Sequence, residues 1–586
     1  MMKKITSYLL ALSLPLFLIT HNVTGKTKRE DREPEAATGF HLKKAAQGQK
    51  FMVAAANPYA VKAGQTILAQ GGSAIDAAIA VQAVLTLVEP QSSGIGGGAF
   101  IMHFDKQTNN LTTFDGRETA PEKASSELFL DKSGKVTPWI KAVVGGRSVG
   151  VPGVLGALAK AHKTQGLLPW KTLFLPAIEL AQNGFIVSPR LEMLLSKKFN
   201  PGVHQMPGTK EYFFPNGEVI KAGTNKKNPD LAHFYKQLAN EGIKAFYFGE
   251  NAKKIANKVQ NSVIAPGLLT VKDINHYVAK QREAVCAPYH EYKVCSMGPP
   301  SSGGVALLQI LRLLEDKNMS QYGVNDVKAL HYFTQASRLA FADRNVYMAD
   351  PDFVDVPVKA LLAQQYITER ASLITQKDMG LAIAGQPVKT LAYAIDDAYE
   401  MPSTSHISIV DSQGDAVSMT TSIEMAFGST LMVNGYLLNN QLTDFALSPT
   451  RNGLPVINRV QGNKRPRSSM SPVMVFNKDG SLRLVIGSPG GSRIINYVAQ
   501  AVVGVLDWGL SAQDAINMPR ITNRNRYTSL EKETQLEHKK LAFEKLGHEV
   551  KIVNLNSGIH AVELLNGRLY GAADPRREGI AMSELN

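Results

Sequence analysis

Thr404 stands where a polar, proline-bearing segment gives way abruptly to a strand pattern, a place suited to a nucleophile. Alternating residues run from 404 to 411, and a four-residue link containing Gly414 leads into a second alternating run, 416 to 423. Two such runs joined by a short link with glycine predict a strand–turn–strand unit. The chemistry that this unit would offer is that of an activated hydroxyl.

The register of this predicted hairpin decides which residues face Thr404. We expect Asp411 to pair with Ala416. That register sets Ser422 opposite Ser405, so that a second hydroxyl lies next to Thr404. A threonine that heads a strand and has a hydroxyl across from it is a candidate nucleophile. Thr and Ser are also common in strands without any chemistry, so the hairpin alone does not decide the function.

Other motifs match catalytic or cofactor patterns only superficially. Residues 146–150 read Gly-x-Ser-x-Gly, but a nucleophile elbow needs its helix to begin at the serine, and Pro152 favours a later start. Residues 94–99 fit a dinucleotide fingerprint, yet no strand precedes them and 100–104 reads as strand, so close backbone packing is the better interpretation. The thirteen histidines form no metal-binding pair, and we interpret His406 as a hydrogen-bonded strand residue.

Helices and strands on both sides of the hairpin must position these groups. Ser73 can cap a helix that runs towards Leu87. Gly487–Arg493 opens a helix to about Leu506, and the free N–H groups of such a helix start bind anions or oxyanions. The remaining predicted elements are the helices 170–183, 252–261, 305–314 and 327–343 and the strands 100–104, 473–476 and 482–486.

The composition of the chain limits the classes of function. Its 586 residues are 44% hydrophobic and 19% charged, enough to bury a large core, and no linker divides them. The net charge of +14 would suit an anionic partner, but the basic residues are scattered and carry no nucleic-acid motif, so we expect no nucleic acid.

The first 25 residues have the order of a secretory signal peptide. Lys3 and Lys4 precede an apolar run, Ile5 to Thr20, and small residues follow it. No other stretch reaches the length of a membrane span, so we expect export to the periplasm or medium and no anchor after signal removal.

Cys286 and Cys295 are the only cysteines. An exported compartment permits a disulfide, and two hairpin strands would bring the two residues together. Two unpaired buried thiols are the alternative, and a metal site would need more ligands.

Several motifs occur in a fixed order over most of the chain. They are Gly71-Gly72-x-Ala74-x-Asp76-Ala77-Ala78, Gly96-Gly97-Gly98-x-Phe100, Pro299–Gly304, Ala342-Asp343-Arg344, Ser403–Asp411, Leu438–Phe445, Arg467–Pro472, Gly487–Arg493 and Asp574-Pro575-Arg576. Together they resemble the γ-glutamyltransferases (γ-glutamyltranspeptidases), a family of exported N-terminal-nucleophile hydrolases.

This resemblance implies an α/β fold, a four-layer α/β/β/α sandwich, formed by two subunits cut from one precursor. The cut would fall between Ser403 and Thr404. Residues 1–25 would be the signal peptide, 26–403 the large subunit and 404–586 the small catalytic subunit. Cutting frees the α-amine of Thr404, which can then serve as the base for its own hydroxyl.

The resemblance also implies roles for individual residues. Thr404 would be the nucleophile, with Ser422 across from it, and the N–H groups of Gly490 and Gly491 would form the oxyanion hole. The residues implied to hold the donor's α-carboxylate are Arg117, Ser468 and Ser469, and those implied to hold its α-ammonium are Gln441, Asp444 and Glu424. No metal or organic cofactor is implied.

Three features depart from the better-known members of that family. Ser422 stands where Thr is usual, and Glu424 stands where Asn is usual. Residues 446–464 are shorter than the corresponding lid-bearing stretch and contain no tyrosine that could cover the site.

The resulting prediction is a self-processing γ-glutamyltransferase and glutathione hydrolase. It would take glutathione and other γ-glutamyl compounds as donors, and water, amino acids or dipeptides as acceptors. One alternative is an acylase of the same fold that acts on glutaryl amides or poly-γ-glutamate. Another is a binding protein of this fold that never matures.

Overall fold

The computed structural model describes residues 37–584, except residues 198, 389–392, 397, 399 and 402. The predicted signal peptide, 1–25, lies outside this range, as do the first residues of the predicted large subunit. Among the described residues, no helix combines the length and the apolar character that crossing a bilayer requires.

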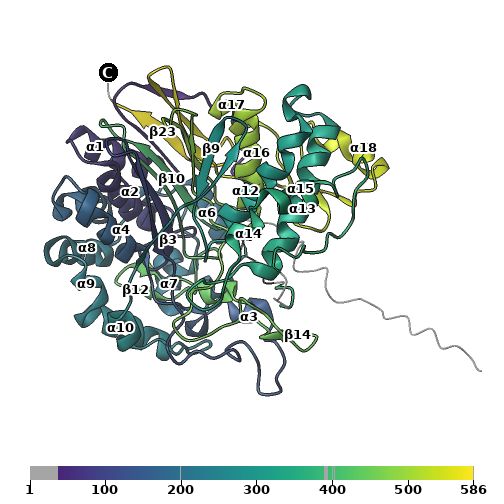
Figure 1. Ribbon diagram of the computed structural model, residues 1–586. Coiled ribbons are helices and arrows are strands. Elements are labelled where there is room, and N and C mark those ends of the chain that lie inside the picture. Colours follow the sequence, from purple (N-terminus) through teal and green to yellow (C-terminus); the bar gives the residue numbers. More distant parts are fainter. Residues whose placement is uncertain are drawn as a thin grey trace, which may run out of the picture. The chain divides into compact units, whose positions relative to one another are not determined.

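Two seven-stranded antiparallel sheets form the centre of the fold (Figure 1). The β10 sheet has the order β23-β2-β10-β11-β3-β4-β7, and the β17 sheet has the order β1-β22-β21-β17-β16-β9-β8. The strands of the β10 sheet are β2 (Met52–Ala55), β3 (Gly98–Asp105), β4 (Asn110–Gly116), β7 (Lys280–Arg282), β10 (Ser405–Val410), β11 (Ala416–Ser422) and β23 (Ile580–Ser583). Those of the β17 sheet are β1 (Ala46–Gly48), β8 (Val285–Tyr289), β9 (Tyr292–Ser296), β16 (Val473–Phe476), β17 (Leu482–Gly487), β21 (His560–Leu565) and β22 (Arg568–Ala573).

Helices cover the outer face of each sheet. Apolar side chains of the β10 sheet, such as Ile407 and Met419, pack on one helical layer, and those of the β17 sheet, such as Val475 and Ile486, pack on the other. The first layer contains α1 (Pro58–Ala69), α2 (Ala74–Val88), α4 (Val154–Gln165), α5 (Leu175–Asn183), α8 (Pro229–Glu241) and α10 (Gly249–Gln260). The second contains α12 (Gly303–Leu314), α13 (Val327–Tyr347), α16 (Ile494–Leu506) and α17 (Ala512–Asn517).

A separate apolar cluster fills the space between the two sheets. It joins Met102 and Val410 of the β10 sheet to Met474 and Val485 of the β17 sheet. Each sheet therefore buries both faces, which explains why strands such as β2 and β16 are apolar on successive residues. The predicted four-layer α/β/β/α sandwich is confirmed.

Local signals explain where several elements begin. Ser73 accepts a hydrogen bond from Asp76 N (3.2 Å) and Asp76 Oδ2 accepts one from Ser73 N (3.0 Å), so the predicted cap of α2 is a complete capping box. In the predicted helix 170–183, a 3-10 turn, Trp170–Phe174, precedes α5.

The predicted hairpin exists, but its register differs by one residue from the expected one. Val410, not Asp411, pairs with Ala416, and Ser405 therefore pairs with Thr421. Asp411 closes the turn instead: its N–H donates to Asp415 O (2.9 Å), and its Oδ1 accepts from Asp415 N (3.0 Å). Gly414, at φ +85°, supplies the left-handed residue that such a turn requires.

The two cysteines lie on adjacent strands of the β17 sheet. Cys286 of β8 pairs directly with Cys295 of β9, and a disulfide joins them. Of the two possibilities left open by the sequence, the structure has the bonded one.

Candidate active site

Thr404 immediately precedes β10, and Ser422 ends β11 on the neighbouring strand. Because Ser405 pairs with Thr421, the corrected register brings Ser422 directly opposite Thr404. Thr404 Oγ1 lies 3.3 Å from Ser422 Oγ, and both residues are buried. The predicted pair of facing hydroxyls is therefore closer than the expected register allowed.

Both hydroxyls point at the carbonyl that precedes Thr404. Thr404 Oγ1 donates to Ser403 O (2.6 Å), and Ser422 Oγ donates to the same oxygen (2.8 Å). Ser403 is itself held, since its hydroxyl donates to Gln91 O. Three buried hydroxyl groups thus fix the peptide bond between Ser403 and Thr404.

Gly97, which immediately precedes β3, permits this arrangement beside β11. A Cβ atom at Gly97 would collide with the carbonyl oxygen of Ser422, and one at Gly96 would collide with that of Leu437. The predicted close backbone packing of residues 94–99 is confirmed, and it bears directly on the site.

Arg117 follows β4 and is almost completely buried. It donates to the carboxylate of Asp444 and to the carbonyl oxygen of Arg467 (2.9 Å). Glu118 Oε2 lies 3.6 Å from Arg117 Nη1, but Arg117 donates to Asp444 instead. Burial therefore dominates and raises the pKa of Glu118 to about 8.

Glu424 and Asp444 share the space next to Arg117. Burial, and then the charge of Asp444, raise the pKa of Glu424 well above its usual value. Burial also raises the pKa of Asp444, to about 6, against the opposing effect of Arg117. Of the two carboxyl groups, Glu424 therefore holds its proton more strongly, and Asp444 is the partner that hydrogen-bonds to Arg117.

Two serines from the segment before β16 complete this side of the site. The carbonyl oxygen of Ser468 accepts hydrogen bonds from Ser302 N (2.7 Å) and Ser302 Oγ (2.6 Å), which hold the segment against the start of α12. Ser469 Oγ accepts a hydrogen bond from Arg344 Nη2 (2.7 Å).

Gly490 and Gly491 lie between β17 and α16, at φ +137° and +56°. These angles favour glycine, because L side chains rarely adopt them. Gly491 begins a 3-10 turn, Gly491–Arg493, that leads into α16, as the glycine-rich helix start predicted. A Cβ atom at Gly491 would press on the backbone of Glu400 and Met401.

Most of the predicted site residues line one small cavity. Its lining includes Arg117, Glu400, Met401, Thr404, Ser422, Glu424, Asp444, Ser468, Ser469 and Gly491. Its volume is about 10 Å³, enough for one water molecule. Gly490 and Gln441 are not in the lining, and the Gln441 amide is buried without a hydrogen-bond partner among the described residues. No residue of 446–464 lines the cavity.

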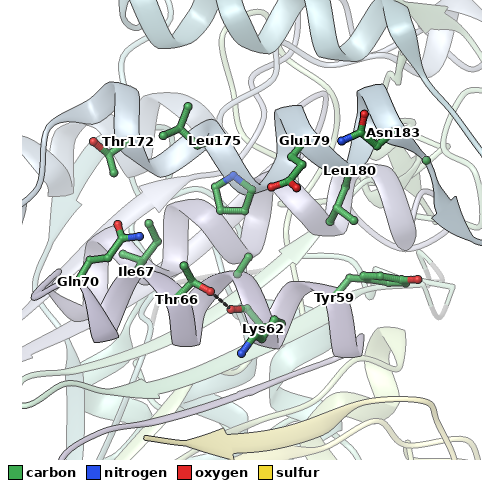
Figure 2. A pocket seen from close by; sticks show the side chains of 13 residues that line it. Tyr59, Lys62, Thr66, Ile67, Gln70, Thr172, Leu175, Glu179, Leu180 and Asn183 are labelled. Carbon is green, nitrogen blue, oxygen red and sulfur yellow. Dashed lines mark hydrogen bonds between the residues drawn. The ribbon is translucent and has the colours of Figure 1, made fainter. Parts of the chain in front are cut away.

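A larger groove lies elsewhere, between α1 and α5 (Figure 2). It encloses about 460 Å³ and is lined by residues such as Lys62, Ile67, Leu175 and Glu179. None of the predicted site residues faces it. We place the candidate site in the smaller cavity, because facing hydroxyls, a buried guanidinium and perturbed carboxylates converge there.

The residues set aside in the sequence play structural parts. Ser148 Oγ donates to the carbonyl oxygens of Val143 and Gly145 (both 3.2 Å), and α4 begins six residues later at Val154. His406 contacts Thr420 Oγ1 (2.9 Å) and Ser408 Oγ (3.0 Å) through its two ring nitrogens. Burial lowers its pKa well below the usual value, so it is neutral.

Sequence reasoning missed three charged residues around the site, Glu400, Arg344 and Arg467. Glu400 Oε1 accepts a hydrogen bond from Arg344 and lies 3.6 Å from Arg467 Nε. Arg344 and Arg467 stand within recognised motifs, but nothing in the sequence pairs them with Glu400. That pairing depends on tertiary contacts.

Comparisons with known proteins agree on one family. The family model described as gamma-glutamyltranspeptidase matches residues 60–584. Over 553 residues, 91% of this chain and 92% of the relative, the chain is 37% identical to a glutathione hydrolase proenzyme of Bacillus subtilis. A solved cephalosporin acylase from Bacillus halodurans aligns with 95% of this chain and 99% of its own, at 25% identity and a TM-score of 0.82. A solved gamma-glutamyltranspeptidase of Helicobacter pylori is 35% identical and aligns with 57% of this chain and 92% of its own, at a TM-score of 0.53.

Proposed function

The chain belongs to the gamma-glutamyltranspeptidase family, and from this premise we propose that it is a self-processing γ-glutamyltransferase and glutathione hydrolase. The observation that carries the proposal is the Ser403 carbonyl, which accepts hydrogen bonds from Thr404 Oγ1 and Ser422 Oγ while it precedes the predicted nucleophile.

The first step is cleavage of the chain by its own hydroxyl. Thr404 Oγ1 attacks the carbonyl carbon of Ser403, and the bond from that carbon to Thr404 N breaks, which leaves an ester and a free α-amine. Water then hydrolyses the ester and releases the carboxyl end of Ser403. The products are a large subunit, 26–403, and a small subunit, 404–586, that remain one heterodimer.

The second step uses the same hydroxyl on a substrate. The new α-amine of Thr404, with an unperturbed pKa of about 7.7–8.0, serves as its base. Thr404 Oγ1 attacks the γ-carbonyl of the donor, the amine leaves, and a γ-glutamyl ester remains. Water, or the amine of an amino acid or dipeptide, then takes the γ-glutamyl group. The N–H groups of Gly490 and Gly491 stabilise the oxyanion in both transfers.

The charged residues select the donor. Arg117, with Ser468 and Ser469, would bind an α-carboxylate in fork geometry. Asp444, together with Glu424 and Gln441, would bind the α-ammonium. Opposite charges on one α-carbon are the mark of a γ-glutamyl group, and the ionised pair Arg117–Asp444 already holds the two complementary charges side by side. The predicted leader, residues 1–25, supports action in the periplasm or outside the cell.

The competing function is that of an acylase acting on glutaryl amides. The cephalosporin acylase with which this chain aligns over 95% of its length supports it, and so does Glu424, because its raised pKa weakens its attraction for an ammonium group. Asp444 weighs against it, because a glutaryl group has no ammonium to bind.

One experiment tests the cut and the donor together. The wild-type chain is expressed, the N-terminus of its small fragment is sequenced, and hydrolysis of glutathione is compared with that of a glutaryl amide. We expect a new N-terminus at Thr404 and a preference for glutathione. A chain that stays whole under folding conditions contradicts the mechanism, and a cut chain that prefers glutaryl amides is an acylase.

The Thr404→Ala variant tests the nucleophile itself. Without Oγ1, neither the peptide bond nor the donor can be attacked, so we expect an uncut chain with no measurable activity. Ser405→Ala is the matched control, because its hydroxyl lies one residue away and contacts Ser93 Oγ (3.1 Å) rather than the cleaved carbonyl. Appreciable activity of Thr404→Ala would refute the assignment.

A further inference from the structure

Glu400 is a buried carboxylate four residues before Thr404, and two arginines surround it. Its Oε1 accepts a hydrogen bond from Arg344 Nη2 and lies 3.6 Å from Arg467 Nε. All three side chains are at least 96% buried. Burial alone would raise the pKa of Glu400, but Arg344 and Arg467 outweigh it and hold that pKa below its usual value. Glu400 is therefore ionised.

This carboxylate stands in the part of the cavity that faces Ser469. Arg344 Nη2 donates to Glu400 and also to Ser469 Oγ (2.7 Å), so one nitrogen links the two residues. Glu400, Ser469 and Arg117 all line the cavity. Ser469 and Arg117 are the residues proposed above to hold the α-carboxylate of a donor. An internal carboxylate thus occupies the neighbourhood of the expected substrate carboxylate.

No donor fits while this segment is in place. The cavity has room for about one water molecule, and Glu400 and Met401 fill the side next to Gly491. Met401 N also donates to Glu424 Oε1 (3.2 Å). Glu400 and Met401 must therefore withdraw before a donor reaches Thr404, and the cut after Ser403 gives them a free end with which to do so.

Withdrawal of Glu400 changes the surroundings of Arg344 more than those of Arg467. Arg467 Nη1 keeps Asp396 Oδ2 at 3.0 Å. Arg344 keeps three neutral partners, Ser302 Oγ (2.8 Å), Asn345 Oδ1 (3.0 Å) and Ser469 Oγ (2.7 Å), which fix its guanidinium in place. Glu400 is the carboxylate that hydrogen-bonds to Arg344, and a buried cation without such a partner is costly. A fixed, buried guanidinium next to Ser469 is a ready carboxylate ligand.

We propose that Arg344 binds the α-carboxylate of the donor in the mature enzyme and that Glu400 is its internal stand-in before cleavage. The inference rests on the proposed function and adds two residues to it. Before the cut, Glu400 is a positioning residue, because its ion pairs hold the backbone that leads to the Ser403 carbonyl. After the cut, the donor's α-carboxylate replaces it between Arg344, Ser469 and Arg117.

The precursor half is tested with Glu400→Gln, which removes the charge and keeps the shape. We expect cleavage between Ser403 and Thr404 to slow at least tenfold in a gel time course. The fraction that is eventually cut should have wild-type kcat and KM, because Glu400 has by then left the site. Glu369→Gln, on the exposed face of α15 (Gln364–Ala371), is the matched control and should cut at the wild-type rate.

Two results would overturn this half. One is cleavage of Glu400→Gln within twofold of the wild-type rate. The other is a cut fraction whose kcat falls by the same factor as the cleavage rate. That result would show that Glu400 supports the fold in general rather than the cleavage step.

The role of Arg344 in the mature enzyme is tested with Arg344→Lys. This change keeps the positive charge facing Glu400 but loses the guanidinium that can bind both oxygens of a carboxylate. Two donors are compared, γ-glutamyl p-nitroanilide and 4-aminobutyryl p-nitroanilide, which lacks the α-carboxylate. The preference for the γ-glutamyl donor is the ratio of its kcat/KM to that of the 4-aminobutyryl donor. In the variant we expect this ratio to fall at least tenfold, mainly through a higher KM for the γ-glutamyl donor. Arg568→Lys, at an exposed position of β22, should leave the ratio unchanged.

An unchanged ratio in Arg344→Lys would overturn the carboxylate role of Arg344. If this variant is not cut, the result of Glu400→Gln decides the inference alone. A wild-type chain that is not cut, or that ignores γ-glutamyl donors, contradicts the proposed function itself. If the wild-type chain is cut and uses γ-glutamyl donors, but both variants behave like it, only the roles proposed for Glu400 and Arg344 are wrong.

Discussion

Ser422 makes more contacts with the cleavage point than its place in the sequence suggests. Its hydroxyl donates to Ser403 O (2.8 Å), lies 3.3 Å from Thr404 Oγ1 and accepts from Glu424 N (2.8 Å). The same atom thus touches the nucleophile, the carbonyl under attack and the backbone of a pocket residue.

Removing that hydroxyl should slow self-cleavage. A hydrogen bond to a group that gains charge is worth about 1.5–3 kcal/mol, so we expect Ser422→Ala to cut roughly ten- to a hundredfold more slowly. Ser422→Thr keeps the hydroxyl and should cut at a rate close to wild type. Gel time courses of the two variants measure the difference, and equal rates would show that Ser422 does not polarise the carbonyl.

Burial of Glu118 makes the stability of the fold depend on pH. Its folded pKa is raised from 4.5 to about 8 by burial. Its contribution to stability is therefore fully present below about pH 4.5 and is lost as pH rises through about 8. Glu118→Gln should remove this loss, by about 1.4 kcal/mol for each pH unit in that window.

The measurement is thermal unfolding of the uncut Thr404→Ala chain with and without Glu118→Gln, at pH 5 and pH 8. We expect the Gln variant to gain Tm relative to its parent at pH 8. A difference that is the same at both pH values would mean that Glu118 does not titrate there.

At the residue scale, the sequence predicted which residues line the site better than it predicted which residues contact one another. Thr404, Arg117, Asp444 and Ser469 line one cavity as motif reasoning led us to expect. The contacts of Glu400 were not predictable, because an isolated glutamate in a polar segment carries no period or motif. Gln441 remains a prediction, since its amide contacts no described hydrogen-bond partner.

At the scale of elements, turn chemistry decided the one wrong detail of the hairpin. Alternation set the two strands correctly, but it is equally compatible with registers that differ in the turn. The side chain of Asp411 caps the turn and moves the first ladder pair to Val410 and Ala416. Helices with strong caps, such as α2, were predictable because their signals are local.

The disulfide joins two adjacent strands, and it should stabilise them without affecting the chemistry. It closes a short hairpin, β8 to β9, with nine residues of sequence separation, for which loop closure suggests about 2–3 kcal/mol of stabilisation. We expect the double variant Cys286→Ser, Cys295→Ser to unfold at lower denaturant and to lose its sensitivity to reductant, while it is cut and hydrolyses donors as wild type. A reductant that shifts both proteins equally would show that the disulfide contributes nothing.

At the scale of the whole molecule, the two predicted subunits are interleaved in both sheets. In the β10 sheet, β2 of the large subunit lies between β23 and β10 of the small one. In the β17 sheet, β1 and β9 of the large subunit flank four strands of the small one. The fold class could be predicted from motif order, whereas this interleaving could not, because strand order depends on long-range pairing.

The interleaving predicts the behaviour of the cut protein. Separating the fragments would break strand pairs at several edges, so they should co-elute on size exclusion after complete cleavage and separate only in denaturant. The uncut Thr404→Ala chain is the control for elution volume. Fragments that separate under native conditions would contradict the shared sheets.

The position of β2 also has a consequence for how the protein is made. β2 (Met52–Ala55) is among the first strands to leave the ribosome, yet one neighbour, β23, is made roughly 530 residues later. At about 5–20 residues per second, an apolar strand waits roughly half a minute to two minutes for its second partner. The β10 sheet therefore cannot close during synthesis, and a holding chaperone would have a long interval in which to bind its open edge.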